Sequence, residues 1–287
     1  MVGPLRSILF VPGARQDRFA KAMNAGADAV VFDLEDSVEA GQRPQARVRV
    51  AEFLATPGTG ALRLVRFNAA RTPDGQADLE YFSGTQGYDG VLLPKVDSAS
   101  AVEEVARAFA RGARSGAVPP LLLLLETPRA ILRAAEIAAA DAPVAALLFG
   151  AEDFTASLAV ERTIDGEELS FARAQIVLAA AAAGADAIDA VCTDLNDADS
   201  LARDCRRARG LGFRGKMAIH PRQVDVINEV FTPAAAEVDR ARRLIDVYEA
   251  ARAAGQGVTT MDGQMVELPI VERARRTLAL AARHRAR

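Results

Sequence analysis

The stretch PPLLLLLETPRA, residues 119–130, contains five consecutive leucines that run directly into a carboxylate, Glu126. A segment this apolar is typical of a parallel strand that is buried on both faces. Burying a carboxylate without a partner costs free energy, so Glu126 is expected to point into a polar mouth at the end of the strand. The stretch therefore predicts a sheet whose buried strands finish in chemically active groups.

Seven further apolar segments recur along the 287-residue chain, with amphipathic helical patterns between them. The eight predicted strands are 7–12, 29–35, 62–68, 90–96, 121–126, 144–150, 187–191 and 215–219. Helical patterns between them include 17–27, 98–113, 166–185 and 197–212, of which the last two are the clearest. Eight strand–helix repeats favour a (β/α)8 TIM barrel. A doubly wound open sheet is the alternative, but no Gly-rich dinucleotide fingerprint follows the first strand.

The chain continues beyond a minimal barrel. Residues 221–231 fit an eighth barrel helix, and a further helix is predicted from Pro233, a residue favoured in a first helical turn. A Gly-containing segment with a strong Asp-Gly turn signal at 262–263 and a final helix, 270–287, follow. We therefore expect a catalytic barrel over 1–231 and a C-terminal helical extension over 232–287.

Composition excludes several classes of protein. The net charge is −3 and there is no Trp, so a basic, aromatic-rich surface for nucleic acid is not expected. No segment reaches the roughly 18 uncharged apolar residues of a membrane span, and the N-terminus lacks the pattern of a secretory signal. The cysteines, Cys192 and Cys205, suggest neither a disulfide framework nor a zinc site. A cytoplasmic protein is expected.

Ionisable and polar groups gather at the predicted strand ends, where barrel enzymes carry their chemistry. They are Asp33, Glu35, Asp36, Arg66, Asn68, Lys95, Glu126, Glu152, Asp153 and His220. Glu126 and Asp153, on adjacent strands, are candidates for an Mg²⁺ site, because Mg²⁺ prefers oxygen ligands and keeps bound water. Glu152 could replace Asp153, and adjacent residues on extended backbone point in opposite directions.

Arg66 is the candidate for holding an anion, since its guanidinium matches a carboxylate with two parallel hydrogen bonds. A purely structural pairing with Asp33 or Glu35 is the alternative. Asn68 and Lys95 are expected to contribute to substrate binding. The three acids Asp33, Glu35 and Asp36 are expected to form a supporting charge network around Arg66 and Lys95, and His220 a positioning element.

Nine motifs in order are similar to those of the citrate lyase β-subunit-like family, which includes malyl-CoA and citramalyl-CoA lyases. They are RSILFVPG, AVVFDLEDSV, VRFN, LLPKV, ETPRA, GAEDF, GADAIDAV, GFRGKMAIHPRQVDVIN and MDGQMVELP, between Arg6 and Pro269. The resemblance implies Mg²⁺-dependent cleavage or condensation of acyl-CoA thioesters with a 2-oxoacid. It also implies a homotrimer, or a hexamer built from trimers.

The resemblance implies roles position by position. Glu126 and Asp153 would bind the metal, Arg66 would contact the oxoacid carboxylate or an enolate oxygen, and Asp262 would be a catalytic acid on a lid from a neighbouring subunit. Arg15, Arg18 and Lys21 would bind coenzyme A. Two positions depart from the common pattern, because Arg43 replaces a frequent Lys and Ala130 a frequent Gly.

Three other functions stay open at this point. The chain could be the β subunit of a citrate lyase complex, acting on a citryl group on an acyl carrier protein. It could couple condensation to thioester hydrolysis, as malate or citramalate synthases do. It could also be a non-catalytic CoA-binding protein, although the intact set of acids and Arg66 argues against that reading.

Overall fold

The computed structural model describes residues 5–58, 60–112, 116–163 and 165–285. Eight parallel strands form a closed barrel in sequence order, and β1 completes it by pairing with β8. The strands are β1 Ser7–Pro12, β2 Ala29–Asp33, β3 Leu62–Arg66, β4 Gly90–Leu93, β5 Leu121–Leu125, β6 Val144–Phe149, β7 Asp186–Asp189 and β8 Gly215–Ala218. The predicted TIM barrel is confirmed.

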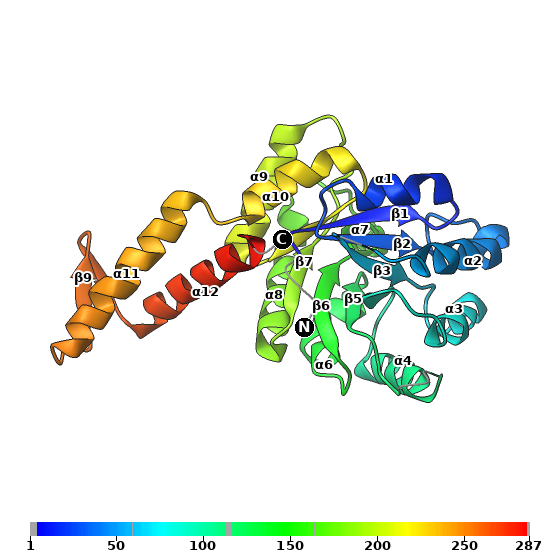
Figure 1. Ribbon diagram of the computed structural model, residues 1–287, viewed down its shortest axis with the longest axis horizontal. Helices are drawn as coiled ribbons and strands as arrows, with labels where there is room; N and C mark the ends of the chain where they lie inside the picture. Colours follow the sequence, from blue (N-terminus) through cyan, green and yellow to red (C-terminus); the bar gives the residue numbers. More distant parts are fainter. Residues whose placement is uncertain (1–4, 59, 113–115, 164, 286–287) are drawn as a thin grey trace. The chain divides into compact units, whose positions relative to one another are not determined.

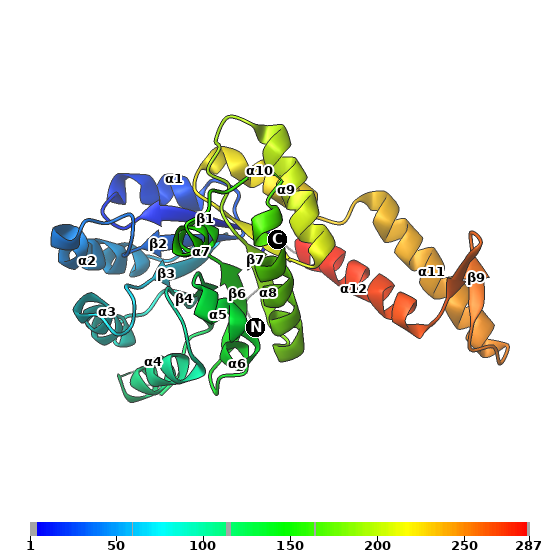
Figure 2. The same ribbon diagram turned by 180° about the vertical axis from the view of Figure 1, so that it is seen from behind.

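Helices surround the outside of the strands, as Figure 1 and the opposite view in Figure 2 show. They are α1 Phe19–Met23, α2 Arg43–Leu54, α3 Pro73–Ser83, α4 Ala99–Gly112, α5 Pro128–Leu132, α6 Ala134–Ala138, α7 Ala151–Leu158, α8 Ser170–Ala183, α9 Ala198–Leu211 and α10 Val224–Phe231. Short 3₁₀ turns at 16–18, 40–42, 167–169 and 221–223 precede four of them. In the part of the chain described, no helix is both long and apolar enough to span a membrane.

The leucines of β5 belong to two separate cores. Leu122 and Leu124 fill the barrel interior, whereas the other three face the helical layer. The run ends where it does because the next residues begin a helix. Thr127 Oγ1 accepts a hydrogen bond from Ala130 N, and Pro128 occupies the first turn of α5. Glu126 and the cap residue Thr127 are thus the two residues between a buried strand and the following helix.

Strands β2 to β8 end one to three residues earlier than the sequence predicts. The residues just beyond the last ladder pairs, such as Asn68, Lys95 and Glu126, lie on backbone that has already left the sheet. An apolar sequence pattern indicates which residues are buried, but not which residues pair in the sheet. The predicted strands therefore extend beyond the last paired residues. This places the polar side chains above the barrel wall.

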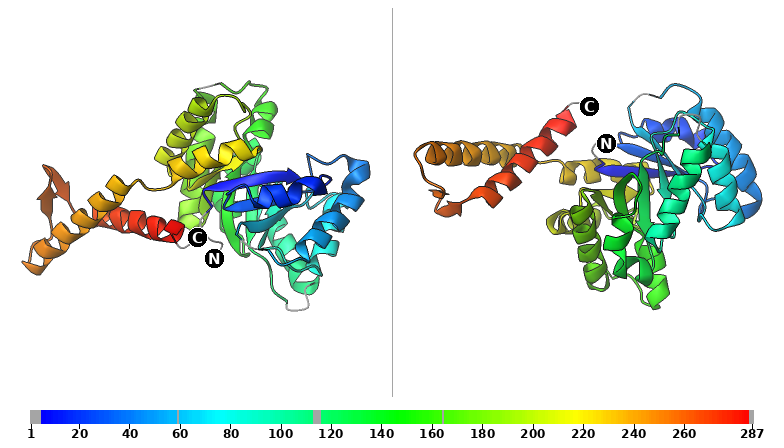
Figure 3. Two further views of the ribbon diagram at one scale, coloured as in Figure 1. Left: turned by 45° about the horizontal axis from the view of Figure 1, so that its top comes forward. Right: turned by 90° about the horizontal axis from the view of Figure 1, so that it is seen from below.

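The residues after the barrel form a second compact unit, Thr232–Arg287, while the first unit covers Met1–Phe231. In the second unit, α11 (Ala235–Ala253) packs along α12 (Leu268–Arg285), and an antiparallel hairpin of β9 (Thr259–Met261) and β10 (Gln264–Val266) connects them (Figure 3). The prediction that Pro233 starts the helix was wrong. Ala234 is the N-cap, and its N–H donates to the Glu237 carboxylate. Residues 286–287 of the predicted last helix lie outside the described ranges.

Candidate active site

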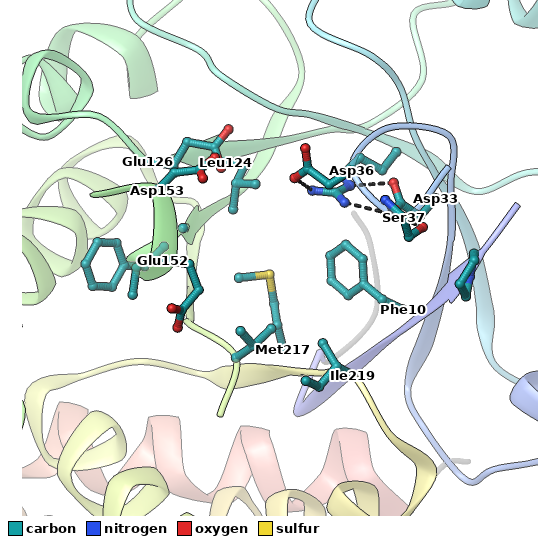
Figure 4. Close-up of a pocket in the computed structure, with 16 residues that line it drawn as sticks. Phe10, Asp33, Asp36, Ser37, Leu124, Glu126, Glu152, Asp153, Met217 and Ile219 are labelled. Carbon is teal, nitrogen blue, oxygen red and sulfur yellow. Dashed lines mark hydrogen bonds and ion pairs between the residues drawn. The ribbon is translucent and has the colours of Figure 1, made fainter. Parts of the chain in front are cut away.

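A cavity of about 410 Å³ lies where the carboxyl ends of the barrel strands meet. Figure 4 shows Glu126 and Asp153 together on one side of it, Asp33, Asp36 and Ser37 across from them, and an apolar wall that includes Phe10, Met217 and Ile219. The remaining lining residues are Pro12, Arg66, Leu124, Phe149, Gly150, Ala151, Glu152 and Val191. The cavity therefore has an acidic part and an apolar part.

Glu126 is only 3% exposed and occupies the space that a side chain at position 150 would need. A Cβ on Gly150 would lie 2.3 Å from the Cβ of Glu126, so glycine is required there. Glu126 Oε1 accepts a 2.7 Å hydrogen bond from the Lys95 backbone N–H. Burial, together with the negative charges of Glu35 and Asp153, raises the pKa of Glu126 to about 8.

Glu152 and Asp153 lie in the first turn of α7, so the expectation that extended backbone would point them in opposite directions was wrong. Both line the cavity. Glu152 forms an ion pair with Arg162, whose Nη1 also donates to the Val191 carbonyl at 3.0 Å. Asp153 has no ion-pair partner among the described residues, and this difference favours Asp153 over Glu152 as a site for a cation.

Arg66 is held by three acids from the second strand and the loop after it. Its Nε and Nη2 donate to the two carboxylate oxygens of Asp33 at 2.6 and 2.7 Å, and Nη1 lies 3.0 Å from Glu35 and 3.2 Å from Asp36. Burial alone would lower the pKa of Arg66, but these acids, Asp33 first, raise it above its ordinary value. The guanidinium carbon lies 5.3 Å from the centre of the Phe10 ring, a cation–π contact.

The predicted charge network extends to Lys95. Its Nζ donates to Glu35 Oε1 at 2.7 Å and lies 3.6 Å from Asp36 Oδ1. Glu35 is therefore shared between Lys95 and Arg66. Burial raises the pKa of Glu35, because desolvation outweighs the attraction of these two cations.

The charged groups around the cavity include more acids than cations. The acids are Asp33, Glu35, Asp36, Glu126, Glu152 and Asp153, and the cations paired with them are Arg66, Lys95 and Arg162. Among the residues described, each acid except Glu126 and Asp153 is within ion-pair distance of a cation. The two carboxylates without an ion-pair partner lie on the same side of the cavity (Figure 4), and the charge of Asp153 acts on Glu126. Two neighbouring negative charges attract a positive ion.

The donor set fits magnesium. No cluster of three or more His, Cys, Asp or Glu side chains capable of holding a metal occurs in the described ranges. Two carboxylates alone leave most of an octahedral coordination shell to water and to ligand oxygens, which is the usual situation for Mg²⁺ in enzymes. A closed zinc site would instead need four protein ligands, with Cys or His among them.

The structure does not bring every predicted residue to the cavity. Asn68 is buried and does not line the cavity, and its Nδ2 donates to the Leu34 carbonyl at 3.0 Å and to Asp78 Oδ2 at 2.8 Å. Its prediction as a substrate-binding residue does not agree with this geometry. Asn68 therefore has a structural role. Its partner Asp78 also accepts hydrogen bonds from the Asn68 backbone N–H and from the Arg47 side chain.

The predicted coenzyme A residues come from the loop after β1 and from α1. Arg15, Arg18 and Lys21 are all exposed, and none lines the cavity. Arg15 makes a two-point ion pair with Asp17 at 2.8–2.9 Å, which raises the pKa of Arg15. These side chains are accessible to a large ligand, but nothing in the geometry distinguishes them from ordinary surface charges.

Asp262 occupies the tip of the β9–β10 hairpin. Asp262 and Gly263 have φ values of 52° and 74°, as the type I′ turn of a two-residue hairpin requires. The predicted Asp-Gly turn is confirmed. His220 fulfils a local role, since its Nδ1 accepts from the Arg222 N–H at 3.2 Å and caps the 3₁₀ turn before α10.

Sequence reasoning missed Arg162 and the apolar wall of the cavity. Arg162 lies in a loop with no recognisable pattern, so no signal predicted its contact with Glu152. The wall was predictable in principle: Met217 and Leu124 alternate with residues that face the helices, as strand periodicity requires. The continuous apolar pattern of these strands hid that alternation.

A closed barrel with an acidic cavity at the carboxyl ends of its strands is the arrangement of a barrel enzyme. The comparison with protein families identifies which one. The chain belongs to the HpcH/HpaI aldolase/citrate lyase family, whose model matches residues 6–221. This confirms the resemblance that the motifs indicate, and the family is one of enzymes of the lyase type.

Relatives of known name are similar over nearly the whole chain. The citrate lyase subunit beta of Escherichia coli (strain K12) is 38% identical over 96% of this chain and 93% of its own length. The (3S)-malyl-CoA thioesterase of Cereibacter sphaeroides (strain ATCC 17025) is 37% identical over 97% and 95%. The crystal structure of CitE from Mycobacterium tuberculosis in complex with magnesium, acetoacetate and coenzyme A has a TM-score of 0.82 and 37% identity, and covers 98% of this chain and 100% of that one.

Proposed function

We propose that this chain is a Mg²⁺-dependent carbon–carbon lyase for 3-hydroxyacyl-CoA thioesters such as malyl-, β-methylmalyl- or citramalyl-CoA. It would cleave them, or form them by condensation, with acetyl-CoA or propionyl-CoA and glyoxylate or pyruvate as the other reactants. The observation that carries this proposal is the pair of carboxylates at the cavity, Glu126 and Asp153, that lack a cationic partner. The magnesium, acetoacetate and coenzyme A bound to the similar CitE structure support it.

In this proposal Glu126 and Asp153 would hold the Mg²⁺ ion, which would supply Lewis-acid polarisation of oxoacid oxygens. Arg66 faces the negative charge that develops when the carbon–carbon bond breaks and its electrons move into the thioester enolate. Its bidentate pair with Asp33 fixes the guanidinium plane before substrate arrives. Asp262 in its protonated form would give a proton to the α-carbon of the released acyl-CoA, and as a carboxylate it would remove that proton in the direction of condensation. The proton of the substrate hydroxyl, which is lost as that carbon becomes the oxoacid carbonyl, would pass to water.

We further propose that Asp262 is delivered by a neighbouring copy of the chain, in a homotrimer or a hexamer built from trimers, so that the second unit acts as a lid in trans and limits water at the cavity. Arg15, Arg18 and Lys21 would contact the phosphates of coenzyme A. The proposed place of action is the cytoplasm.

Two other reactions have support of their own. The Escherichia coli relative is a subunit of citrate lyase, so a citryl group on an acyl carrier protein is an alternative substrate. The Cereibacter sphaeroides relative is a thioesterase, so hydrolysis of the thioester is an alternative reaction. Both would use the same barrel and the same cavity.

One experiment separates these functions. The purified chain is incubated with Mg²⁺ and with malyl-, β-methylmalyl-, citramalyl- or citryl-CoA, and the oxoacid, acyl-CoA and free CoA are quantified. A lyase releases oxoacid and acyl-CoA in equal amounts, whereas a thioesterase releases free CoA and no oxoacid. Cleavage of citryl thioester alone, and only with carrier protein and partner subunits present, would support the citrate lyase complex instead.

The role of Asp262 is tested by Asp262→Asn, because asparagine also tolerates the left-handed turn conformation. We expect cleavage to fall by at least about 100-fold, as the loss of a general acid–base predicts, while light scattering shows an unchanged oligomer. An active Asp262→Asn enzyme would contradict the assignment. Partial recovery of activity on mixing Asp262→Asn with Glu126→Gln chains would show that the two residues meet between subunits.

A further inference from the structure

Lys95 follows β4 and links the two parts of the charged network through different atoms. Its backbone N–H donates to Glu126 Oε1 at 2.7 Å, while its ammonium group donates to Glu35 Oε1, also at 2.7 Å. Glu126 belongs to the proposed metal pair, and Glu35 contacts Arg66. A single residue therefore connects the group proposed to hold the ion with the group proposed to hold the substrate anion.

The backbone of Lys95 has a conformation that lysine rarely adopts. Its φ is +53°, in the left-handed region, where a side chain crowds the backbone. Strained backbone of this kind persists where surrounding contacts determine it. Here the contact is the hydrogen bond to Glu126 Oε1. The other oxygen, Oε2, lies beside Gly150 at the cavity wall and accepts no hydrogen bond within the described ranges.

The ammonium group of Lys95 already has an ion partner, Glu35. Its ammonium shares Glu35 with Arg66 Nη1, which lies 3.0 Å from the other oxygen of that carboxylate. If the ammonium were removed, Glu35 would keep Arg66 as its ion partner and would compete more strongly with any substrate anion. The positive charge on Lys95 would also no longer oppose the binding of a cation between Glu126 and Asp153.

We infer that Lys95 is a positioning residue with two separable tasks, an inference that rests on the proposed function. Its left-handed backbone amide orients Glu126 so that Oε2 faces the cavity. Its ammonium binds Glu35 together with Arg66, so that Glu35 competes less with the substrate anion for Arg66. The same positive charge lowers the affinity of the site for Mg²⁺. This replaces the expectation that Lys95 contacts the substrate.

The ammonium task is tested with Lys95→Met, which keeps the backbone amide and removes the charge. Calorimetry without substrate should show Mg²⁺ binding about three- to tenfold tighter than in the parent, since a nearby positive charge is gone. The KM for the cleaved thioester should rise about tenfold. Lys95→Arg should restore both values. Arg107→Met, which removes a positive charge on the exposed surface of α4, should change neither.

Unchanged or weaker Mg²⁺ binding in Lys95→Met would overturn the ammonium task, because a merely structural role predicts such a loss. The same conclusion follows if Lys95→Arg behaves like Lys95→Met. A parent protein that binds no Mg²⁺ would refute the proposed metal site instead, and the two failures are thus distinct.

The backbone task has a separate measurement that does not depend on folding of the Lys95 variants. Amide hydrogen exchange at Lys95 should be at least tenfold faster in Glu126→Ala than in the parent, because the acceptor is lost. The amide of Val91, which donates to Pro120 O inside the barrel, serves as the reference and should not change. Equal exchange at Lys95 in both proteins would overturn the backbone task.

Discussion

Two clusters of buried charge lie on the same barrel and have opposite character. Between β7, β8 and the helices outside them, Arg173 and Lys216 each contact both Asp189 and Asp204 at 2.6–2.9 Å. Two cations meet two acids there, and Lys216 is fully buried. At the cavity, Glu126 is 3% exposed and, among the described residues, has no cation within ion-pair distance. The first cluster is balanced and the second is not.

The pKa shifts express this difference. Burial would raise the pKa of Asp204, but Lys216 and Arg173 lower it well below its usual range. Burial and the charges of Glu35 and Asp153 together raise the pKa of Glu126 to about 8, and the Lys95 N–H and Arg66 offset only part of this shift. A fold gains nothing from collecting carboxylates without cations. We infer that the balanced cluster serves stability, and that the unbalanced one is poised for a ligand cation.

Neutralising the unpaired acids should give the largest effect and is the strongest test of this difference between the two clusters. Glu126→Gln or Asp153→Asn should weaken Mg²⁺ binding by at least about 100-fold, more than the loss of an outer-shell partner, and should abolish cleavage. Calorimetry and the oxoacid assay measure the two effects. Thermal stability in metal-free buffer at pH 7 should change little, because Glu126 with a pKa of about 8 is mostly protonated there and Asp153 is only half-buried.

Glu152→Gln provides the matched control, since Glu152 is the neighbour of Asp153 on α7 and is already paired with Arg162. We expect its Mg²⁺ affinity to stay within about threefold of the parent, as for an exposed, salt-bridged carboxylate. A loss as large as that of Asp153→Asn would mean that Glu152 is the ligand.

The balanced cluster should respond in the opposite way. Lys216→Met would leave Asp189 and Asp204 with Arg173 alone, and we expect a loss of about 3–5 kcal/mol in the free energy of unfolding, the usual cost of removing one partner from a buried ion pair. Denaturant titration checks this. Mg²⁺ affinity of the folded fraction should stay at the parental value, and a lost metal site with intact stability would contradict the division of roles.

The last prediction concerns the dependence of stability on pH. The pKa of Glu126 without a cation, about 8, exceeds its ordinary value of 4.5, so the folded protein binds the proton more tightly than the unfolded chain. Its contribution to stability is complete below about pH 4.5 and is lost as pH rises through about 8, with a slope of up to about 1.4 kcal/mol per pH unit.

Denaturant titrations between pH 6 and 9 test this, with and without Mg²⁺. The slope attributed to Glu126 is the difference between the parent and Glu126→Gln in metal-free buffer. Saturating Mg²⁺ should remove that difference, because the ion binds the deprotonated carboxylate. Identical slopes in the parent and in Glu126→Gln would show that Glu126 titrates normally.

Much of the fold was predictable because buried parallel strands have a simple signature. All eight strands were located from their apolar runs, and Glu126, Arg66 and Asp33 were recognised because a charge directly follows such a run. The network of Asp33, Glu35 and Asp36 around Arg66 and Lys95 was also expected and is present.

The remaining features depend on tertiary contacts that no local pattern encodes. Lys216 lies inside a strand read as apolar, and Arg173 lies on a helix read as amphipathic, so their buried pairing with Asp189 was not foreseen. Asn68 resembles Glu126 in following a strand closely, but a helix residue, Asp78, holds it away from the cavity. Whether a polar group at a strand end faces substrate or structure is decided by its neighbours on other elements.

The five leucines of β5 have one more consequence, which concerns strand register. A slip of one residue normally exchanges the inner and outer faces of a strand at a large hydrophobic cost. In Leu121–Leu125 it would exchange leucine for leucine, so burial alone does not fix the alignment. On the C-terminal side of the strand, the first side chain that can oppose a slip is Glu126, followed by the cap at Thr127. The carboxylate proposed to bind the ion thus also marks where the wall of the barrel must stop.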